Sequence, residues 1–198
     1  MAPNSRIPLT APALRLPAWT RAWLAARSGR RGTLDARMAL AIELAAENAQ
    51  RGSGGPFGAA VFERGAGRLI AVGVNRVVAS GLSCAHAEML AIALAQRARG
   101  SFDLAAPGRP ALELVTSSEP CAMCFGAIPW SGVTRLVCGA RAADAEAIGF
   151  DEGPKPRGWI AALERRGIAV VRDVRRADAV AVLRAYAAAG GAIYNPSA

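Results

Sequence analysis

The chain has 198 residues, 53% of them hydrophobic and 20% charged, which is typical of one globular domain with a sizeable core. Its formal net charge is +9, but residues 1–34 hold six arginines and no acid, so the rest carries 18 basic and 15 acidic groups. This balance permits a polyanionic partner without requiring one. No apolar run approaches the roughly 18 residues of a membrane span, which excludes a membrane protein of that kind.

Residues 1–32 form a basic extension that precedes a domain expected over 33–198. The extension has no apolar stretch followed by a cleavage site, so we expect no secretory signal and a cytoplasmic protein. In a reducing cytosol the four cysteines indicate metal binding or core packing rather than disulfides. A second basic cluster between Lys155 and Arg176 is interpreted as a solvated surface in preference to an RNA-binding face.

The predicted elements begin with a helix over 33–52, capped by Thr33 and ended by Gly52. Two apolar runs around a glycine turn predict a β-hairpin over 58–75, and a loop follows over 76–83. The remaining predicted strands cover 111–118, 133–140 and 168–174, and the remaining predicted helices cover 85–100, 121–130, 156–167 and 176–191. This order predicts an α/β fold with a five-stranded mixed sheet between layers of helices.

The only histidine of the chain, His86, lies in the stretch Cys-Ala-His-Ala-Glu at 84–88. A second unusual stretch, Glu-Pro-Cys-Ala-Met-Cys at 119–124, places Cys121 and Cys124 three residues apart. Both stretches fall at predicted helix starts, and two cysteines at this spacing share one helical face. One imidazole and two thiolates would leave the fourth position of a zinc ion open, as in catalytic sites. The pattern alone leaves another divalent ion open as the occupant.

Each motif has an alternative explanation when it is taken singly. A lone Cys-x-x-Cys can be redox-active or half of a structural zinc site, and a lone histidine is more often packed or on the surface. Cys138 lies within a predicted strand and is interpreted as a small core residue. Cys84, two residues before His86, is expected to pack or to line the site without binding metal.

Glu88 follows His86 by two residues, close enough to accept a proton from a metal-activated water without itself binding the metal. The combination His-x-Glu with Pro-Cys-x-x-Cys is the signature of zinc deaminases that act on nucleobases. With these motifs the chain resembles the cytidine-deaminase-like superfamily over roughly residues 33–195. The resemblance implies a three-layer α/β/α sandwich, a zinc cofactor, and Glu88 as the proton shuttle for a zinc-bound hydroxide that attacks the ring carbon bearing the amine.

The resemblance also implies how the substrate is held. Backbone N–H groups of Ala87 and Cys121 are candidates to stabilise developing charge, and Asn75 matches an asparagine that hydrogen-bonds the base. Phe57 and Trp130 are candidates to sandwich a purine ring.

Within the superfamily, the stretches Gly-Gly-Pro-Phe-Gly at 54–58 and Ile-Gly-Phe-Asp at 148–151 are most similar to bacterial guanine deaminases and nucleoside deaminases. The likeness implies hydrolysis of guanine to xanthine and ammonia. Asp151 is expected to accept hydrogen bonds from the N1–H and 2-amino groups of guanine. Tyr194 is the candidate for a C-terminal aromatic residue that caps the site, either within its own subunit or across a homodimer that exchanges its tails.

Other members of the superfamily remain alternatives. One is a tRNA adenosine deaminase that converts the wobble adenosine to inosine, for which tRNA would be the partner. Another is a cytosine, nucleoside or triazine deaminase, and a non-catalytic partner subunit is disfavoured because Glu88 is intact. The chain departs from guanine deaminases in its long extension and at Pro129, where an aromatic residue is often found.

Overall fold

The computed structural model describes residues 14–27 and 29–195. A five-stranded mixed sheet forms its centre, in the order β2-β1-β3-β4-β5. β1 is antiparallel to both of its neighbours, whereas β3, β4 and β5 are parallel. The strands are β1 (Gly58–Glu63), β2 (Leu69–Val74), β3 (Leu112–Ser118), β4 (Arg135–Ala140) and β5 (Ala169–Val171). The predicted five-stranded mixed sheet is thereby confirmed.

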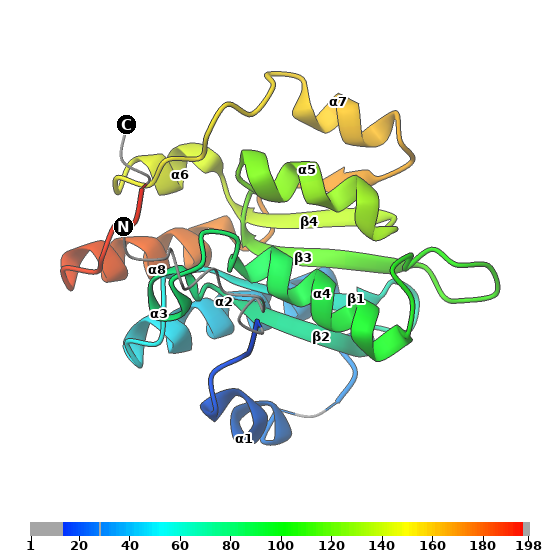
Figure 1. The fold of residues 1–198 in the computed structure, drawn as a ribbon, viewed down its shortest axis with the longest axis horizontal. Helices are drawn as coiled ribbons and strands as arrows, with labels where there is room; N and C mark the ends of the chain where they lie inside the picture. The colour runs from blue at the N-terminus through cyan, green and yellow to red at the C-terminus, as the bar shows by residue number, and fades with distance from the viewer. Residues whose placement is uncertain (1–13, 28, 196–198) are drawn as a thin grey trace, which may run out of the picture.

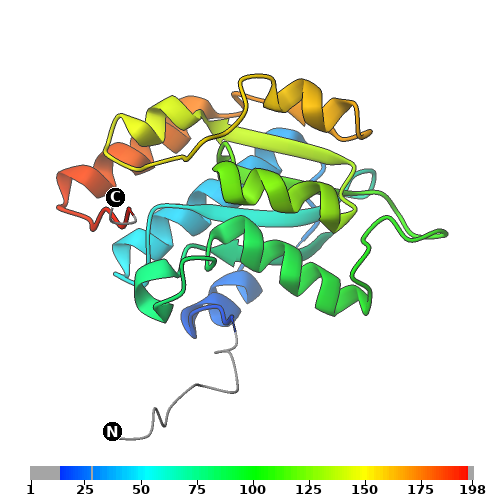
Figure 2. The same ribbon diagram turned by 45° about the horizontal axis from the view of Figure 1, so that its top comes forward.

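Helices cover both faces of this sheet, as Figures 1 and 2 show. α2 and α8 supply one core cluster, and α4, α5 and α7 supply the other. The helices are α1 (Trp19–Ala25), α2 (Leu34–Gln50), α3 (Val77–Ser80), α4 (Ala87–Arg99), α5 (Ala122–Ser131), α6 (Ala142–Glu146), α7 (Trp159–Glu164) and α8 (Arg176–Ala188). The three-layer α/β/α sandwich is confirmed.

Cross-strand rows of aliphatic side chains explain why the sheet is buried on both faces. One row faces α2 and α8 and runs through Val72, Ala60, Val115, Val137 and Val171. The opposite row, displaced by one residue along each strand, faces α4, α5 and α7; it consists of Ala71, Val61, Leu114, Leu136 and Val170. Because side chains alternate along a strand, a sheet covered on both faces needs near-continuous apolar strands, as this sequence has.

Local signals predicted most boundaries but missed α1, in the basic extension, and two shorter helices. Thr33 caps α2, its hydroxyl accepting from the Ala36 N–H at 3.1 Å. The stretch 76–83, predicted as a loop, contains α3, which is held by side-chain bonds such as that from Val77 N–H to Asn75 Oδ1. α6 was also not predicted. Helices of four and five residues are too short to show amphipathic periodicity.

Part of the basic extension packs on the domain. Trp23 of α1 is buried in the same cluster as α2 and α8, and Trp19 Nε1 donates to Ser53 Oγ at 3.0 Å. Residues 1–13 lie outside the described part of the chain. Over the described residues, none of the helices combines the length and the apolar character needed to cross a membrane.

One edge of the sheet gathers the starts of two helices. Because β1 runs opposite to its neighbours, its first residue lies at the same edge as the carboxyl ends of β2, β3 and β4, where α4 and α5 begin. Gly73 allows close contact there, since a Cβ at this position would lie 1.9 Å from the Ala87 carbonyl oxygen. Ligands bind in α/β sheets at such carboxyl edges.

Candidate active site and metal centre

The three predicted metal ligands meet at this edge. His86 is the N-cap of α4, Cys121 is the N-cap of α5, and Cys124 follows in the first turn of α5. The Nδ1 atom of His86 lies 3.5 Å from Cys121 Sγ and 3.6 Å from Cys124 Sγ. All three ligand atoms lie within 4.8 Å of one another. The structure therefore brings together residues that the sequence separates by up to 38 positions.

These separations fit a tetrahedral zinc ion. Zinc–sulfur bonds of about 2.3 Å and zinc–nitrogen bonds of about 2.0–2.1 Å at tetrahedral angles place sulfur and nitrogen about 3.5–3.6 Å apart. The donor chemistry fits as well. The hydrogen bond with Cys124, assisted by that with His86, lowers the pKa of Cys121 to about 4 despite burial. The hydrogen bond with Cys121 and burial raise the pKa of Cys124. One thiolate and one thiol thus share a proton that a dication can displace.

Glu88 faces this cluster from the first turn of α4. Its side chain is buried and lines the cavity in front of the ligands. Burial, reinforced by the charge of Cys121, raises the pKa of the Glu88 carboxyl. A raised pKa makes it easier for the Glu88 carboxylate to take up a proton, which is one half of general acid–base work.

The cavity has a volume of about 440 Å³ and an aromatic wall. Phe57 and Phe150 meet edge to face with ring centroids 4.9 Å apart, and Phe150 meets Tyr194 in the same way at 5.0 Å. All three rings line the cavity. Flat apolar faces of this kind suit a planar heterocycle.

Asn75 lies at the end of β2 and is buried on the cavity wall. Its Oδ1 accepts from Val77 N–H at 3.2 Å, which leaves the amide nitrogen to donate to a ligand. Its backbone carbonyl accepts from Asn48 Nδ2 at 2.8 Å, and Asn48 also binds the Gly55 carbonyl at 2.9 Å. The buried Asn48 thus ties the loop before β1 to Asn75 on the cavity wall.

The neighbouring acids Asp151 and Glu152 differ in burial and in hydrogen bonding. Asp151 lines the cavity but is exposed, and its Oδ1 accepts from Gly153 N–H at 2.8 Å. Glu152 is buried, and within the described residues its Oε2 has no hydrogen-bond partner. Burial, with the charges of Cys121 and Glu88, raises the pKa of Glu152 to about 8. A buried carboxyl oxygen without a partner is costly, so Glu152 is the better candidate to meet a ligand.

The other predicted residues fall into two groups. Ala87 occupies the first position of α4, beside His86, and Tyr194 reaches the cavity of its own chain. Asn195 secures this tail: its Nδ2 donates to the Gly149 carbonyl, and its Oδ1 accepts from Asp151 N–H.

Trp130, by contrast, lies at the end of α5, is 79% exposed and does not line the cavity. The expected sandwich between Phe57 and Trp130 is therefore not formed within this chain.

Phe150, Glu152 and Asn195 were missed as site residues by sequence reasoning. Phe150 belongs to the Ile-Gly-Phe-Asp stretch that was singled out, and Glu152 directly follows it, but nothing in the sequence shows which of the two neighbouring acids is buried. Asn195 acts through tail contacts that no local pattern indicates.

Comparison with known families agrees with this geometry. The model of the cytidine and deoxycytidylate deaminase zinc-binding region matches residues 33–140. The chain belongs to this family of zinc-dependent deaminases.

Three relatives define the likeness more closely. The solved structure of a guanine deaminase from Nitrosomonas europaea is 51% identical over 90% of this chain and 97% of its own, with a TM-score of 0.83. The structure of NE0047 in complex with 2,6-diaminopurine is 52% identical over 92% of this chain and 97% of its own, with a TM-score of 0.84. The guanine deaminase of Bacillus subtilis strain 168 is 41% identical over 57% of this chain and 67% of its own.

The metal centre makes the first testable prediction. The purified protein should hold about one zinc per chain, and Cys121→Ser or Cys124→Ser should remove most of it, because loss of one thiolate weakens a three-ligand site. Cys84→Ser is the matched control, since Cys84 is exposed and outside the cluster. Metal analysis by mass spectrometry measures the content. Full zinc occupancy in either ligand variant would contradict the assignment.

Proposed function

We propose that this deaminase hydrolyses guanine to xanthine and ammonia. The observation that carries the proposal is the 51% identity, across nine tenths of the chain, to a guanine deaminase. The aromatic cavity in front of the His86 and cysteine cluster supports it, because a free base needs apolar faces and a few polar groups.

We assign the metal to His86, Cys121 and Cys124, and when bound it supplies an activated water as nucleophile. Glu88 takes the proton from the attacking water and passes it to the ring nitrogen beside the reacting carbon. A second transfer through Glu88 protonates the amine, which leaves as ammonia. Backbone N–H groups of Ala87 and Cys121, at the starts of α4 and α5, lie where developing negative charge needs donors.

The chemistry of guanine changes the role expected for Asp151. The amine that leaves is the 2-amino group, so it must face the metal and cannot also be the group that a distant carboxylate reads. We propose Glu152 as the carboxyl group that meets the base edge, because it is buried with an unpartnered oxygen, whereas Asp151 is exposed and bonded to its own loop. Asn75 donates its amide to an acceptor of the base, and Phe57, Phe150 and Tyr194 contact the ring.

The charges around the cavity favour a free base over a nucleotide or a tRNA. Among the described residues that line it are four acids and no arginine or lysine; the acids are Glu88, Glu119, Asp151 and Glu152. Phosphate groups bind to cationic side chains, so this lining disfavours a substrate that carries them. The tRNA adenosine deaminase, cytosine, nucleoside and triazine alternatives become outcomes of the substrate test below.

The proposal also covers the oligomeric state of the protein. We propose a homodimer, because Met123 and Trp130 are exposed two turns apart on one side of α5. The contacts of Tyr194 and Asn195 within one chain favour a tail that covers its own site over an exchanged tail.

Four cysteines without disulfide partners fit a cytoplasmic location.

The substrate is tested by ammonia release over guanine, guanosine, cytosine, cytidine, adenine, ammeline and a tRNA anticodon stem-loop. Guanine should be the best substrate of the set. Glu88→Gln should keep its zinc and lose about 10²- to 10⁴-fold in kcat, since the proton carrier is gone. Preference for any other member of the set would replace guanine, and an active Glu88→Gln enzyme would remove Glu88 from the mechanism.

The roles of Glu152 and Asp151 can be distinguished by replacing each side chain with its isosteric amide. Glu152→Gln should lower kcat/KM for guanine about 10- to 100-fold, the range expected when a buried donor of the base loses its acceptor oxygen. Asp151→Asn, the matched control in the same loop, should change it less than about threefold. Steady-state kinetics give both values. The reverse order of effects would return the role to Asp151.

The dimer interface is tested with Trp130→Glu. A charge at the centre of an apolar contact should convert the dimer to a monomer, measured as molar mass by light scattering after size exclusion. Val78→Glu is the control, because Val78 is also exposed but belongs to α3. A monomeric wild-type protein, or an undisturbed dimer in Trp130→Glu, would exclude this face.

A further inference from the structure

Lys155 is the only lysine among the 24 basic residues of the chain; the other 23 are arginines. Its position is as unusual as its identity, because its side chain is only 9% exposed. Lysine is almost never buried without a partner. Lysine and arginine are interchangeable at many solvated positions but not where the shape of the cation matters.

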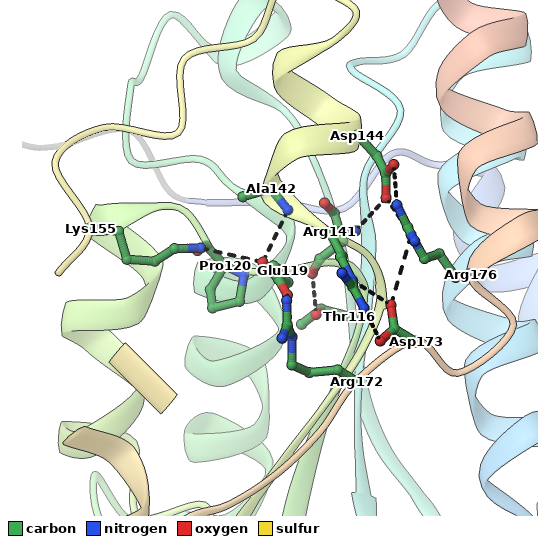
Figure 3. Close-up of polar contacts among 11 residues, drawn as sticks. Thr116, Glu119, Pro120, Arg141, Ala142, Asp144, Lys155, Arg172, Asp173 and Arg176 are labelled. Carbon is green, nitrogen blue, oxygen red and sulfur yellow. Dashed lines mark hydrogen bonds and ion pairs between the residues drawn. The ribbon is translucent and has the colours of Figure 1, made fainter. Parts of the chain in front are cut away.

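The ammonium group of Lys155 has three neighbours. Nζ donates to the backbone carbonyl of Pro120 at 2.8 Å and lies 3.8 Å from Glu119 Oε2. It also lies 4.7 Å from the centroid of the Trp159 ring. Figure 3 shows the side chain reaching from its loop toward Pro120 and Glu119. The contacted carbonyl belongs to the residue immediately before the ligand Cys121.

Glu119, one of the neighbours of Lys155, is itself held in place by other contacts. Its carboxylate accepts from Ala142 N–H at 3.1 Å and forms an ion pair with Arg172, so it is fixed independently of Lys155 (Figure 3). Pro120 has no N–H, and its carbonyl precedes the N-cap of α5, outside the hydrogen bonds of the helix. The ammonium thus binds a backbone oxygen that the fold holds in place.

The loop that carries Lys155 also carries groups of the cavity. Asp151, Glu152, Gly153 and Pro154 all line it. Among the hydrogen bonds of the described residues, two join this loop to the start of α5: Ala122 N–H donates to the Glu152 carbonyl at 2.9 Å, and Lys155 Nζ donates to Pro120. The bonds of Lys155 N–H to Gly153 and of Trp159 N–H to Pro156 lie within the loop and do not fix it to α5.

We propose that Lys155 is a positioning residue for base recognition, which fastens the loop bearing Glu152 to the backbone that precedes Cys121. The inference rests on the proposed function and deepens it. A compact ammonium can donate to Pro120 while lying against Trp159 and Glu119. The guanidinium of an arginine is broader and planar, so we expect that it cannot replace the compact ammonium in this nearly closed space.

The test compares Lys155→Met, Lys155→Gln and Lys155→Arg with Arg157→Met, an exposed basic residue of the same loop. Lys155→Met should raise KM for guanine about tenfold or more, the effect of losing a charged hydrogen bond, and change kcat less than about threefold. The Kd for 8-azaguanine should rise in parallel. Zinc content should stay near one per chain. Lys155→Gln, which keeps a donor, should recover part of the loss, Lys155→Arg should not, and Arg157→Met should match wild type.

Other results overturn the proposal. Unchanged KM and Kd in a folded Lys155→Met protein would leave Lys155 without a role in binding. Loss of zinc from the Lys155→Met protein would show that Lys155 acts on metal binding and not on the base. A lower Tm with unchanged kinetics would show that its role is purely structural. Full recovery by Lys155→Arg would show that charge alone suffices. If Lys155→Met does not fold, Lys155→Gln and Lys155→Arg carry the comparison. A wild-type enzyme inactive on guanine refutes the proposed function, whereas an active wild type with an equally active Lys155→Met refutes only this inference.

Discussion

The imidazole nitrogen of His86 lies 3.5 Å from the sulfur of Cys121 and 3.6 Å from that of Cys124, and all three atoms lie within 4.8 Å of one another. Two thiolates in such a cluster repel each other, so ionisation of one thiol disfavours ionisation of the other. The opposite pKa shifts of Cys121 and Cys124 express this competition. A zinc ion held by His86, Cys121 and Cys124 would relieve this repulsion, because zinc binds thiolates and neutral imidazole.

The fold makes this cluster by aligning two helix starts at one sheet edge. Parallel strands send their carboxyl ends to the same side, so the helices that follow β2 and β3 begin next to each other. Gly73 lets the first turn of α4 sit against the sheet, and Pro120 sets the start of α5. Free N–H groups at both helix starts add positive potential, which favours the thiolates and the negative charge that develops during deamination. One architectural feature therefore serves both metal binding and transition-state stabilisation.

Sequence reasoning predicted what local periodicity and short motifs encode. The strands, the long helices and the ligands His86, Cys121 and Cys124 follow from hydrophobic runs and from one distinctive spacing. It failed where tertiary contacts decide. Glu152 and Asp151 are adjacent acids, and only the packing of their loop on α5 buries one and exposes the other. Trp130 was placed in the cavity because aromatic residues suit bases, but the helical turn points it to solvent.

The distribution of charge shows why the overall composition was a poor guide to the substrate. Many arginines of this basic protein are paired with acids away from the cavity, as in the ion pairs of Arg141 with Asp173 and of Arg176 with Asp144. The cavity itself is lined by acidic side chains, and the ammonium of Lys155, close to the lining residue Glu119, donates to the backbone of Pro120. The net positive charge of the chain is therefore not reflected in the lining of the cavity. The chemistry of the binding site, rather than net charge, decides between a nucleobase and a nucleic acid.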